Sequence, residues 1–512
     1  MPRIPSPRSR HLAPVATLAL ALFISRLALA EPMKPVGAFE HHQDVGGPTL
    51  AGNAVYDPRA QTYTLSGAGP SAGDALEPLH FAWKKLEGDF IVQASVRFVG
   101  AAPPRRELGI LVRDTLAGSS RYAAGSVHGD TLTALQYRAS AGAASQVAVS
   151  SFHPTEIQLS RSGNRITFSA ATFGESYKSV SQEIGLAREV SVGLFVASHE
   201  AGVAAQAVFS NVRVIIPAAP DFKPYRDYLG SHLEVLDVAT GQREILHSEP
   251  GSIQAPNWAR DDKLIYNSAA GMMYTYDIAS GKVAELQTGA QRQNNNDHVL
   301  SFDGKMLALS NYAGEPRRSV AFILPVTGSE HPEQITSPEA GHTFLHGWSP
   351  DGKKLLFTGS RGGETGDHRN LWSVDVRTKV ETALTPPGTL DDGAEYTPDG
   401  KHIYFNSVRT GTMQIWRMRA DGSRPEQVTF DEYNDWFPHI SPDGKWLVYI
   451  AFPADMDPWS HPFYRQCYIR LMPVSGGAPK TIGYIYGGQG SMNTPGWSPD
   501  GKRIAFVSNS KL

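Results

Sequence analysis

Three histidines in the C-terminal half of the chain stand at related distances from a repeated Asp-Gly turn. His298 and His346 each precede the turn aspartate by five residues, and His439 precedes it by four. The nearby carboxylates are Asp297, Asp391, Asp392, Glu395 and Asp435. Neutral imidazoles beside carboxylates are what a transition-metal site or a general-base site requires. We therefore predict that His298, His346 and His439 bind a divalent metal; the alternative is that each ring hydrogen-bonds a backbone group of its own loop.

Four side chains are candidates for catalysis, namely Glu395, Asp392, Asp435 and His461. Glu395 lies in an apolar strand entry, where a carboxylate needs a partner or a chemical role. Asp392 and Asp435 have an alternative interpretation, because an aspartate ahead of a strand often closes an Asx-turn. His461 belongs to a long insertion rich in aromatic residues, 453–464, which is either a lid over a site or a packing flap.

A ring of mostly polar residues emerges when seven positions are counted back from each turn aspartate. The ring is Gln254, Asn296, Phe344, Asp392, Trp436 and Asn493. Amides, carboxylates and flat rings suit a sugar or a peptide. The predicted ligand-binding residues are Gln254, Asn296, Asp297, Asn434, Trp436, Gln489 and Asn493. Gln489 lies in the segment 487–490, Gly-Gly-Gln-Gly, which lacks the Lys and Ser/Thr of a phosphate loop and is expected to bring backbone close to the ring.

An internal repeat must position all of these residues. Copies of the turn Ser/Thr-Pro-Asp-Gly-Lys begin at Ser349, Thr397, Ser441 and Ser498, and degraded copies begin at Ser301 and Ala259. Each copy leads into a short alternating run such as 354–357, which is typical of a strand, so each turn predicts a hairpin. A second repeated unit, seen at 371–376 and 415–422, predicts an outer hairpin between successive copies.

The order of these hairpins predicts a closed ring of six blades. The series starts with an outer pair at 232–247 and ends with an inner pair at 503–508. These two pairs must complete one blade, because closure removes the exposed strand edges. We therefore predict an all-β protein with a six-bladed β-propeller over residues 231–512, in which the ring residues and the histidines converge on one mouth of the central channel.

Residues 31–217 lack the repeat and predict a separate domain. The run Phe90 to Phe98 alternates strictly, which places its apolar residues toward a core and Gln93, Ser95 and Arg97 toward solvent. Similar runs at 157–160, 165–170, 192–198 and 204–215 predict a β-sandwich, followed by a linker over 218–230.

The first thirty residues have the pattern of a cleavable secretory signal. Three arginines precede an apolar run at 12–24, which ends near Ala28-Leu29-Ala30 and is too short to span a bilayer. We expect a periplasmic or secreted protein without a transmembrane segment. The single cysteine, Cys467, excludes an intramolecular disulfide. A net charge of −3 with mixed signs argues against nucleic acid and anionic membrane surfaces as partners.

The pattern Trp-Ser-Pro-Asp-Gly-Lys, at 348–353 and 497–502, resembles the propeller repeats (PD40, WD40-like) of the TolB-like family. The resemblance covers about residues 228–512 and implies a propeller. TolB itself works in the Tol-Pal envelope system and carries an α/β domain before its propeller, whereas this chain has a predicted β-sandwich there. That sandwich looks like the concanavalin-A-like or laminin-G-like class, also of jelly-roll type, many members of which bind or process sugars.

Three functions are compatible with these features. The first is an exported binding protein that recognises a glycan or an envelope protein at the channel mouth. The second is a carbohydrate-active enzyme, a lyase or hydrolase, that uses the histidines and carboxylates with or without a divalent metal. The third is a TolB-like role in envelope assembly. A prolyl-peptidase arrangement is excluded, because no Gly-x-Ser-x-Gly motif is followed by a helical α/β domain.

Overall fold

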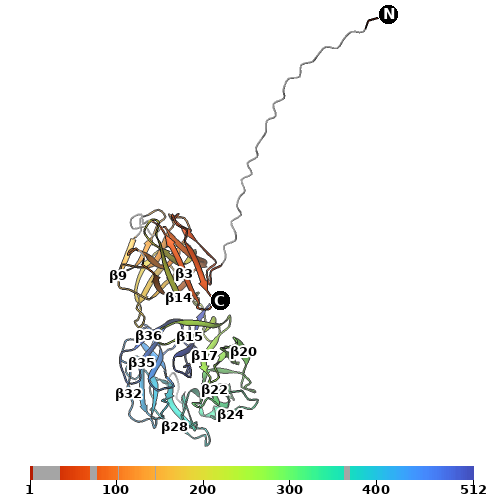
Figure 1. The fold of residues 1–512 in the computed structure, drawn as a ribbon. Coiled ribbons are helices and arrows are strands. Elements are labelled where there is room, and N and C mark those ends of the chain that lie inside the picture. The colour runs from red at the N-terminus through yellow and green to blue at the C-terminus, as the bar shows by residue number, and fades with distance from the viewer. Residues whose placement is uncertain (4–34, 70–77, 102, 144–145, 362–368) are drawn as a thin grey trace.

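The computed structural model describes residues 1–3, 35–69, 78–101, 103–143, 146–361 and 369–512, so the predicted signal, apart from its first three residues, lies outside the described part. In that part the chain forms strands and one short 3-10 helix, η1 (Pro338–Ala340). The strands gather into two units, which we call the two-sheet unit (36–216) and the six-sheet unit (230–510) (Figure 1). No helix of the described residues is long and apolar enough to cross a membrane.

The two-sheet unit consists of two antiparallel sheets of seven strands each. The first has the order β1 (His41–Val45), β4 (Leu79–Glu87), β13 (Glu189–Ala197), β6 (Glu107–Arg113), β7 (Tyr122–His128), β8 (Leu132–Arg138), β9 (Gln146–Ser151). The second has the order β12 (Lys178–Glu183), β11 (Arg165–Ala171), β10 (Glu156–Ser162), β5 (Phe90–Val99), β14 (Ala204–Ile215), β3 (Thr62–Ala68), β2 (Asn53–Asp57). Apolar residues of both sheets form one shared core.

Strand β5 shows how sequence alternation builds this core. Phe90, Val92 and Ala94 lie in the core shared by the two sheets, as the alternation predicts. The expectation that Gln93 faces solvent is wrong, because its side chain is only 4% exposed. Residues of the six-sheet unit cover this face, and the Gln93 amide donates to Gln158 Oε1 at 2.8 Å. The buried amide therefore retains a hydrogen-bond partner.

The six-sheet unit consists of small antiparallel sheets that follow one another along the chain. Five have four strands in sequence order: β17 (Ile253–Trp258), β18 (Lys263–Ser268), β19 (Met273–Asp277), β20 (Lys282–Glu285); β21 (Asn294–Leu300), β22 (Met306–Ala313), β23 (Arg318–Pro325), β24 (Glu333–Gln334); β25 (Phe344–Trp348), β26 (Lys354–Gly359), β27 (Asn370–Asp375), β28 (Glu381–Ala383); β29 (Asp391–Tyr396), β30 (His402–Ser407), β31 (Gln414–Arg419), β32 (Glu426–Gln427); and β33 (Asn434–Ile440), β34 (Trp446–Phe452), β35 (Arg465–Pro473), β36 (Lys480–Gly487). The sixth has the order β16 (Arg243–Glu249), β15 (Gly230–Asp237), β37 (Arg503–Ser510).

The repeated turn is a local hydrogen-bonded unit. In one copy the Ser349 hydroxyl donates to Asp351 at 2.7 Å, and the Lys353 amide donates to the same carboxylate at 3.1 Å. Gly352 adopts φ +70°, a left-handed conformation that favours glycine. In the degraded copy Asp262 occupies the glycine position with φ +55°, a conformation that aspartate tolerates better than most residues. The turn therefore starts a hairpin whatever the rest of the fold does.

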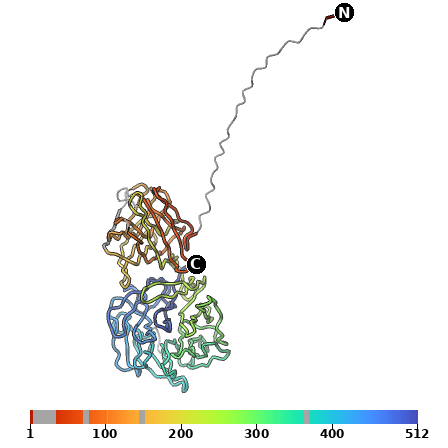
Figure 2. Tube along the Cα trace, viewed as in Figure 1, coloured from red at the N-terminus to blue at the C-terminus, as the bar shows by residue number. Residues whose placement is uncertain are grey.

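The first and last segments of the six-sheet unit pair with each other, as the hairpin order predicts. Strand β15 pairs with β37 from Gly230–Ser510 to Asp237–Arg503. Apolar clusters join this sheet to β17–β20 on one side and to β33–β36 on the other. Every other pair of consecutive sheets also shares a core, such as the cluster of Val299, Leu345 and Phe357. The C-terminus accordingly lies at the junction between the two units (Figure 2).

The segment expected to be a linker packs along the six-sheet unit. The Ala218 amide donates to the Tyr486 hydroxyl at 3.0 Å, and the Leu229 amide donates to the Tyr464 hydroxyl at 3.2 Å. Phe222 contacts the Tyr464 ring edge-on, at a centroid distance of 5.2 Å. Residues 218–230 thus form a bound strap.

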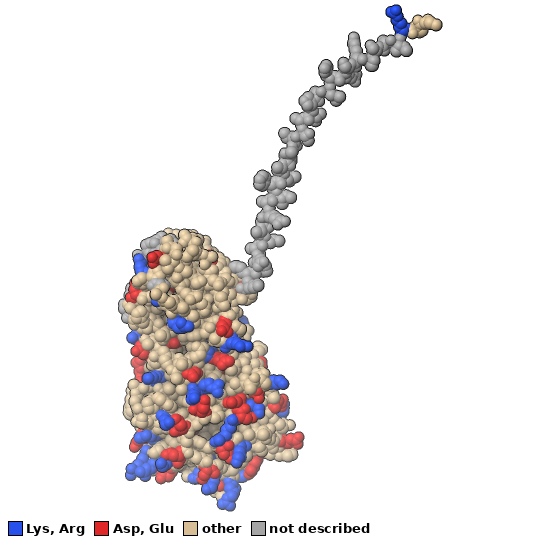
Figure 3. Space-filling model, viewed as in Figure 1, with Lys and Arg blue, Asp and Glu red and all other residues tan. Residues whose placement is uncertain are grey.

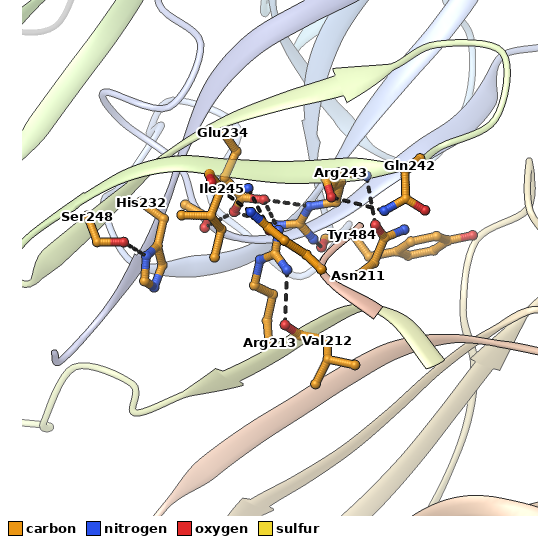
Figure 4. A network of polar contacts seen from close by, with 12 residues as sticks. Asn211, Val212, Arg213, His232, Glu234, Gln242, Arg243, Ile245, Ser248 and Tyr484 are labelled. Atoms are coloured by element: carbon orange, nitrogen blue, oxygen red, sulfur yellow. Dashed lines mark hydrogen bonds and ion pairs between the residues drawn. The ribbon is translucent and has the colours of Figure 1, made fainter. Parts of the chain in front are cut away.

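A buried charge cluster holds the two units together at this junction (Figure 4). The fully buried carboxylate of Glu234 accepts from Arg213 of β14 at 2.5 Å and from Arg243 of β16 at 2.7 Å. The Ser508 hydroxyl of β37 also donates to it. Burial opposes the ionisation of Glu234, but the two arginine charges outweigh it and hold the pKa of its carboxyl far below the usual range.

The visible surface carries both signs of charge. Lysine and arginine are interspersed with aspartate and glutamate over the six-sheet unit, and no basic stripe is seen on this face (Figure 3). This agrees with the balanced composition of 47 basic and 50 acidic residues.

We predict that Glu234→Gln destabilises the protein by about 3–5 kcal/mol, because it leaves two buried guanidinium groups without a counter-charge. The matched control is Glu426→Gln, which breaks an exposed pair with Arg417 and should cost less than about 1 kcal/mol. Urea unfolding monitored by tryptophan fluorescence measures both variants. Equal midpoints for the two variants would contradict the importance assigned to Glu234.

Candidate functional site

A cavity of 740 Å³ opens at one end of the six-sheet unit. The first strands of the four-stranded sheets, which we call the innermost strands, begin at this end; they are β17, β21, β25, β29 and β33. Residues at the starts of these strands line the cavity, together with Tyr225 and Tyr228 of the strap and His461 and Phe463 of the insertion. Such a volume lies within the usual range for small-molecule sites.

The cavity gathers eight of the fourteen residues predicted to be catalytic, ligand-binding or metal-binding, in addition to Phe344 of the counted ring. The eight are Gln254, Asn296, Asp297, His346, Asp392, His461, Gln489 and Asn493. In each four-stranded sheet the pairing between the first and second strands shifts register, and the shift lies close to the predicted ring position. Such a bulge re-aims side chains at the end of a strand, and here it accompanies the convergence of these side chains on the cavity.

In the sheet β33–β36, the residue that faces the cavity differs from the one predicted by counting back from the turn. Trp436, the expected ring residue, is fully buried and does not line the cavity, whereas Phe437 does. Phe437 adopts φ +54° at the bulge, and the His461 ring packs on Trp436 at a centroid distance of 4.3 Å. The insertion therefore covers Trp436, and the next residue takes the position that faces the cavity.

Glu395 and His439 form a pair away from the cavity. His439 Nδ1 lies 2.8 Å from Glu395 Oε2, and its Nε2 lies 2.8 Å from the Met492 carbonyl. The other Glu395 oxygen accepts from the Ile440 amide at 3.1 Å. Glu395, predicted to be catalytic, and His439, predicted to bind a metal, thus have hydrogen-bond partners within the protein. Glu395 lines a separate cavity, whose lining includes residues of the repeated turns.

Three other predicted residues also lie outside the cavity lining. His298 is fully buried, with Nδ1 3.4 Å from Asn257 Oδ1, and burial lowers its pKa to about 3. The Asn434 side chain accepts from the Met413 amide at 3.1 Å and donates to a backbone carbonyl of the insertion. Asp435 is buried 3.7 Å from an Arg470 nitrogen, and burial raises its pKa well above the usual range.

The predicted metal ligands do not assemble into a centre. In the part of the chain that the structure describes, no three His, Cys, Asp or Glu side chains are placed to hold a metal ion. His346 lines the cavity, whereas His298 and His439 do not. His298 and His439 therefore do not share a site with His346 in this structure.

His346 and Asp392 form the main charged pair of the cavity. His346 Nε2 lies 2.8 Å from Asp392 Oδ1, and both side chains are almost fully buried. Burial alone would lower the pKa of His346, but the charge and hydrogen bond of Asp392 outweigh it and raise that pKa. Burial likewise opposes ionisation of Asp392, yet His346 holds its pKa below the usual range. The geometry therefore favours an imidazolium–carboxylate pair.

Two further ionisable groups line the same cavity in different states. Burial raises the pKa of Asp297 to about 6, an effect that Asp392 reinforces and His346 opposes. Burial lowers the pKa of His461 to about 4, so its ring is neutral at pH 7. The cavity thus holds one paired carboxylate, one carboxyl that titrates near pH 6, and one neutral imidazole.

A chain of amides forms another wall of the cavity. Asn493 Nδ2 donates to Gln489 Oε1 at 3.2 Å, and Gln489 Nε2 donates to Asn296 Oδ1 at 3.4 Å. As expected, the glycine-rich segment brings backbone close: the Gly490 carbonyl accepts from the Ala255 amide at 2.7 Å, and a Cβ on Gly490 would lie 3.0 Å from Gln254 Cγ.

Known proteins share this architecture and sequence. The family model for the TolB β-propeller domain (PD40) matches residues 299–456. An uncharacterised protein of Agrobacterium fabrum, Atu1656, is 39% identical over 278 residues, which are 54% of this chain and 92% of that protein. The chain belongs to the TolB-type β-propeller family.

Other relatives give the same assignment for part of the chain. The solved structure of a TolB candidate from Agrobacterium tumefaciens is 38% identical, with a TM-score of 0.52, and covers 56% of this chain and 100% of its own. The Tol-Pal system protein TolB of Anaeromyxobacter dehalogenans is 30% identical over 108 residues, which are 21% of this chain and 23% of that protein. This match therefore spans less than a quarter of that TolB.

The cavity of this TolB-type chain also contains residues that the distances from the repeated turn did not predict. They include Tyr225 and Tyr228 of the strap, Tyr312, Arg317, Arg369 and Phe463. These residues lie outside the innermost strands, so their distance in sequence from the repeated turn does not indicate that they face the cavity. The aromatic insertion was the only feature in the sequence that pointed to one of them.

We predict that Asp392→Asn lowers the pKa of His346, because it removes the charge and hydrogen bond that most strongly oppose burial and leaves Asp297 as the remaining nearby charge. A histidine titration by NMR, with the His346 signal assigned from the spectrum of His346→Gln, measures the change. Asp421→Asn, in an exposed turn, is the control and should leave this titration unaltered. An unchanged His346 pKa in Asp392→Asn would contradict the pairing.

Proposed function

We propose that this TolB-type chain is an exported glycan-binding protein and that the 740 Å³ cavity is its binding site. The observation that carries the proposal is the composition of one enclosed surface, where amides and charged groups alternate with the rings of Tyr225, Phe344 and Phe437. Amides and carboxylates bond sugar hydroxyls, and aromatic rings pack on the apolar faces of sugars. An envelope protein is the other partner expected from the sequence, and it would have to insert a polar loop into the same cavity.

We infer that the six small sheets are the blades of one propeller. Each sheet shares an apolar cluster with the next, and the sheet containing β37 shares clusters with the first and the last complete sheets. The cavity then lies at one mouth of the central channel, where innermost strands begin. The two-sheet unit is, on this view, a concanavalin-A-like sandwich, with its two seven-stranded sheets around a single core.

The test of glycan binding is an array of neutral, carboxylated and sulfated oligosaccharides probed with the mature protein. We expect a small set of related glycans to bind. Asn296→Leu keeps the branched shape of a buried cavity side chain and removes its amide, so these glycans should bind about tenfold more weakly, a loss of about 1.4 kcal/mol.

The control for this experiment is Asn164→Leu, at an exposed turn of the two-sheet unit, which should bind as the wild type does. Absence of any binding glycan, or equal binding by Asn296→Leu, would refute the proposal. Capture of an envelope protein by the wild type but not by Asn296→Leu would assign the cavity to a protein partner.

A second function, carbohydrate cleavage, is favoured by one observation. Asp297, whose pKa is raised to about 6, lines the same cavity as the His346–Asp392 pair. A carboxyl that titrates near neutrality is suited to general acid–base catalysis. On this view the reaction is a β-elimination, in which Asp297 accepts the proton from the carbon beside a sugar carboxylate. The electrons of that C–H bond form a carbon–carbon double bond, and the glycosidic C–O bond breaks, with water supplying the proton to the leaving oxygen. The His346 imidazolium stabilises the negative charge that develops on the carboxylate.

We expect such activity to rise with pH through about 6, as Asp297 loses its proton. Incubation of each bound glycan with the protein, followed by mass spectrometry of the products across pH 4–8, measures it. Asp297→Asn should abolish cleavage while glycan binding persists. Unchanged glycans at every pH would leave the protein a binding protein only.

A further inference from the structure

A second cavity of 310 Å³ adjoins the first on the side of the insertion. The two cavities share four lining residues, which are Tyr225, Arg369, His461 and Phe463. The smaller cavity adds Trp459, whose side chain is 39% exposed. The two cavities therefore meet at the four shared side chains.

Two other arginines that lie on aromatic rings in this unit each have a carboxylate partner. Arg361 lies 4.7 Å from the Phe357 centroid and pairs with Glu381 at 2.7 Å, and Arg409 lies 5.1 Å from the Phe405 centroid and pairs with Asp391 at 2.9 Å.

The Arg369 guanidinium likewise lies 5.1 Å from the Phe344 centroid. However, among the described residues no carboxylate lies within ion-pair distance of it. The Phe344 ring orients the guanidinium. The N–H groups of Arg369 can therefore bind a ligand where the two cavities meet.

Charges on both sides of Arg369 restrict what it can bind. Asp392 is already paired with His346. The Arg369 charge acts on Asp297 and opposes the rise of its pKa, but the two side chains form no ion pair among the described residues. Arg317 donates to Gln293 at 2.7 Å and lies on the Tyr312 ring, so it is held at another wall of the large cavity. The Arg369 guanidinium, which has no carboxylate partner among the described residues, therefore lies where the two cavities share their lining, a position that we call the neck.

We infer that the ligand is an acidic oligosaccharide that occupies both cavities, with a carboxylate or sulfate bound by Arg369 at the neck. Guanidinium binds either group through two parallel hydrogen bonds, which fixes the sugar that carries it. Trp459 then packs on a further sugar in the smaller cavity. This inference rests on the proposed glycan-binding function and names the class of glycan.

The test compares each glycan bound on the array with its own neutral form. Carboxyl reduction converts a uronate into the neutral sugar of the same stereochemistry, and desulfation does the same for a sulfated sugar. We expect calorimetric affinities of the wild type to fall at least tenfold for the neutral form. Which of the two treatments weakens binding identifies the anionic group.

Variants connect this selectivity to Arg369. Arg369→Gln should bind the acidic and neutral forms equally weakly, while Arg369→Lys should retain part of the preference. The control is Arg503→Gln, because Arg503 also lies on an aromatic ring, 4.7 Å from the Trp258 centroid, and lines neither cavity. It should keep the full preference of the wild type. Trp459→Ala should weaken binding of tetrasaccharides and leave disaccharides unaffected.

The outcomes separate this inference from the function on which it rests. If only neutral glycans bind, or if Arg369→Gln keeps the wild-type preference with an unchanged melting temperature, the acidic ligand is refuted while glycan binding stands. If no glycan on the array binds, the proposed function fails, and the inference fails with it. Equal effects of Trp459→Ala on short and long glycans would refute occupation of the second cavity.

Discussion

The arrangement of the whole chain depends on the buried carboxylate of Glu234. Arg213 reaches it from the two-sheet unit, Arg243 from the neighbouring strand, and Ser508 from the last strand. A buried carboxylate is unfavourable without such partners. Because Arg213 belongs to the two-sheet unit and Ser508 to the last strand, Glu234 has all of its partners only when the first and last strands have paired and the two units have docked. The strap that lines the cavity is positioned by the same docking.

Repetition and irregularity have separate roles in this molecule. The repeated turns and hairpins build similar sheets, and their bulges direct one residue from each innermost strand to a common end. The distinctive groups come from segments that break the repeat: Tyr225 from the strap, and His461 and Phe463 from the insertion. Function concentrates in such segments because they can vary without disturbing the scaffold.

The ionisable groups of the cavity show how burial and pairing divide similar side chains. Asp392 is held charged by His346, whereas Asp297 titrates near pH 6 because burial outweighs its favourable interactions. His346 is held charged by Asp392, whereas His461, packed on Trp436, is neutral. A site with paired and unpaired charges of both signs suits a ligand that carries hydroxyls and an acidic group.

The sequence by itself determined the strands, the turns, the pairing of the two ends and eight of the predicted site residues that line the cavity. These features follow from hydrogen bonds and side-chain alternation over a few residues, or from simple counting within a repeat. It placed Trp436 and His439 in the site and missed Arg369, and only the tertiary structure decided these positions. A one-residue bulge exchanges Trp436 for Phe437, and His439 turns to Glu395, which lies 44 residues away in the chain. Such contacts depend on how separate sheets and loops pack, because burial and charge pairing act between residues that no local pattern connects.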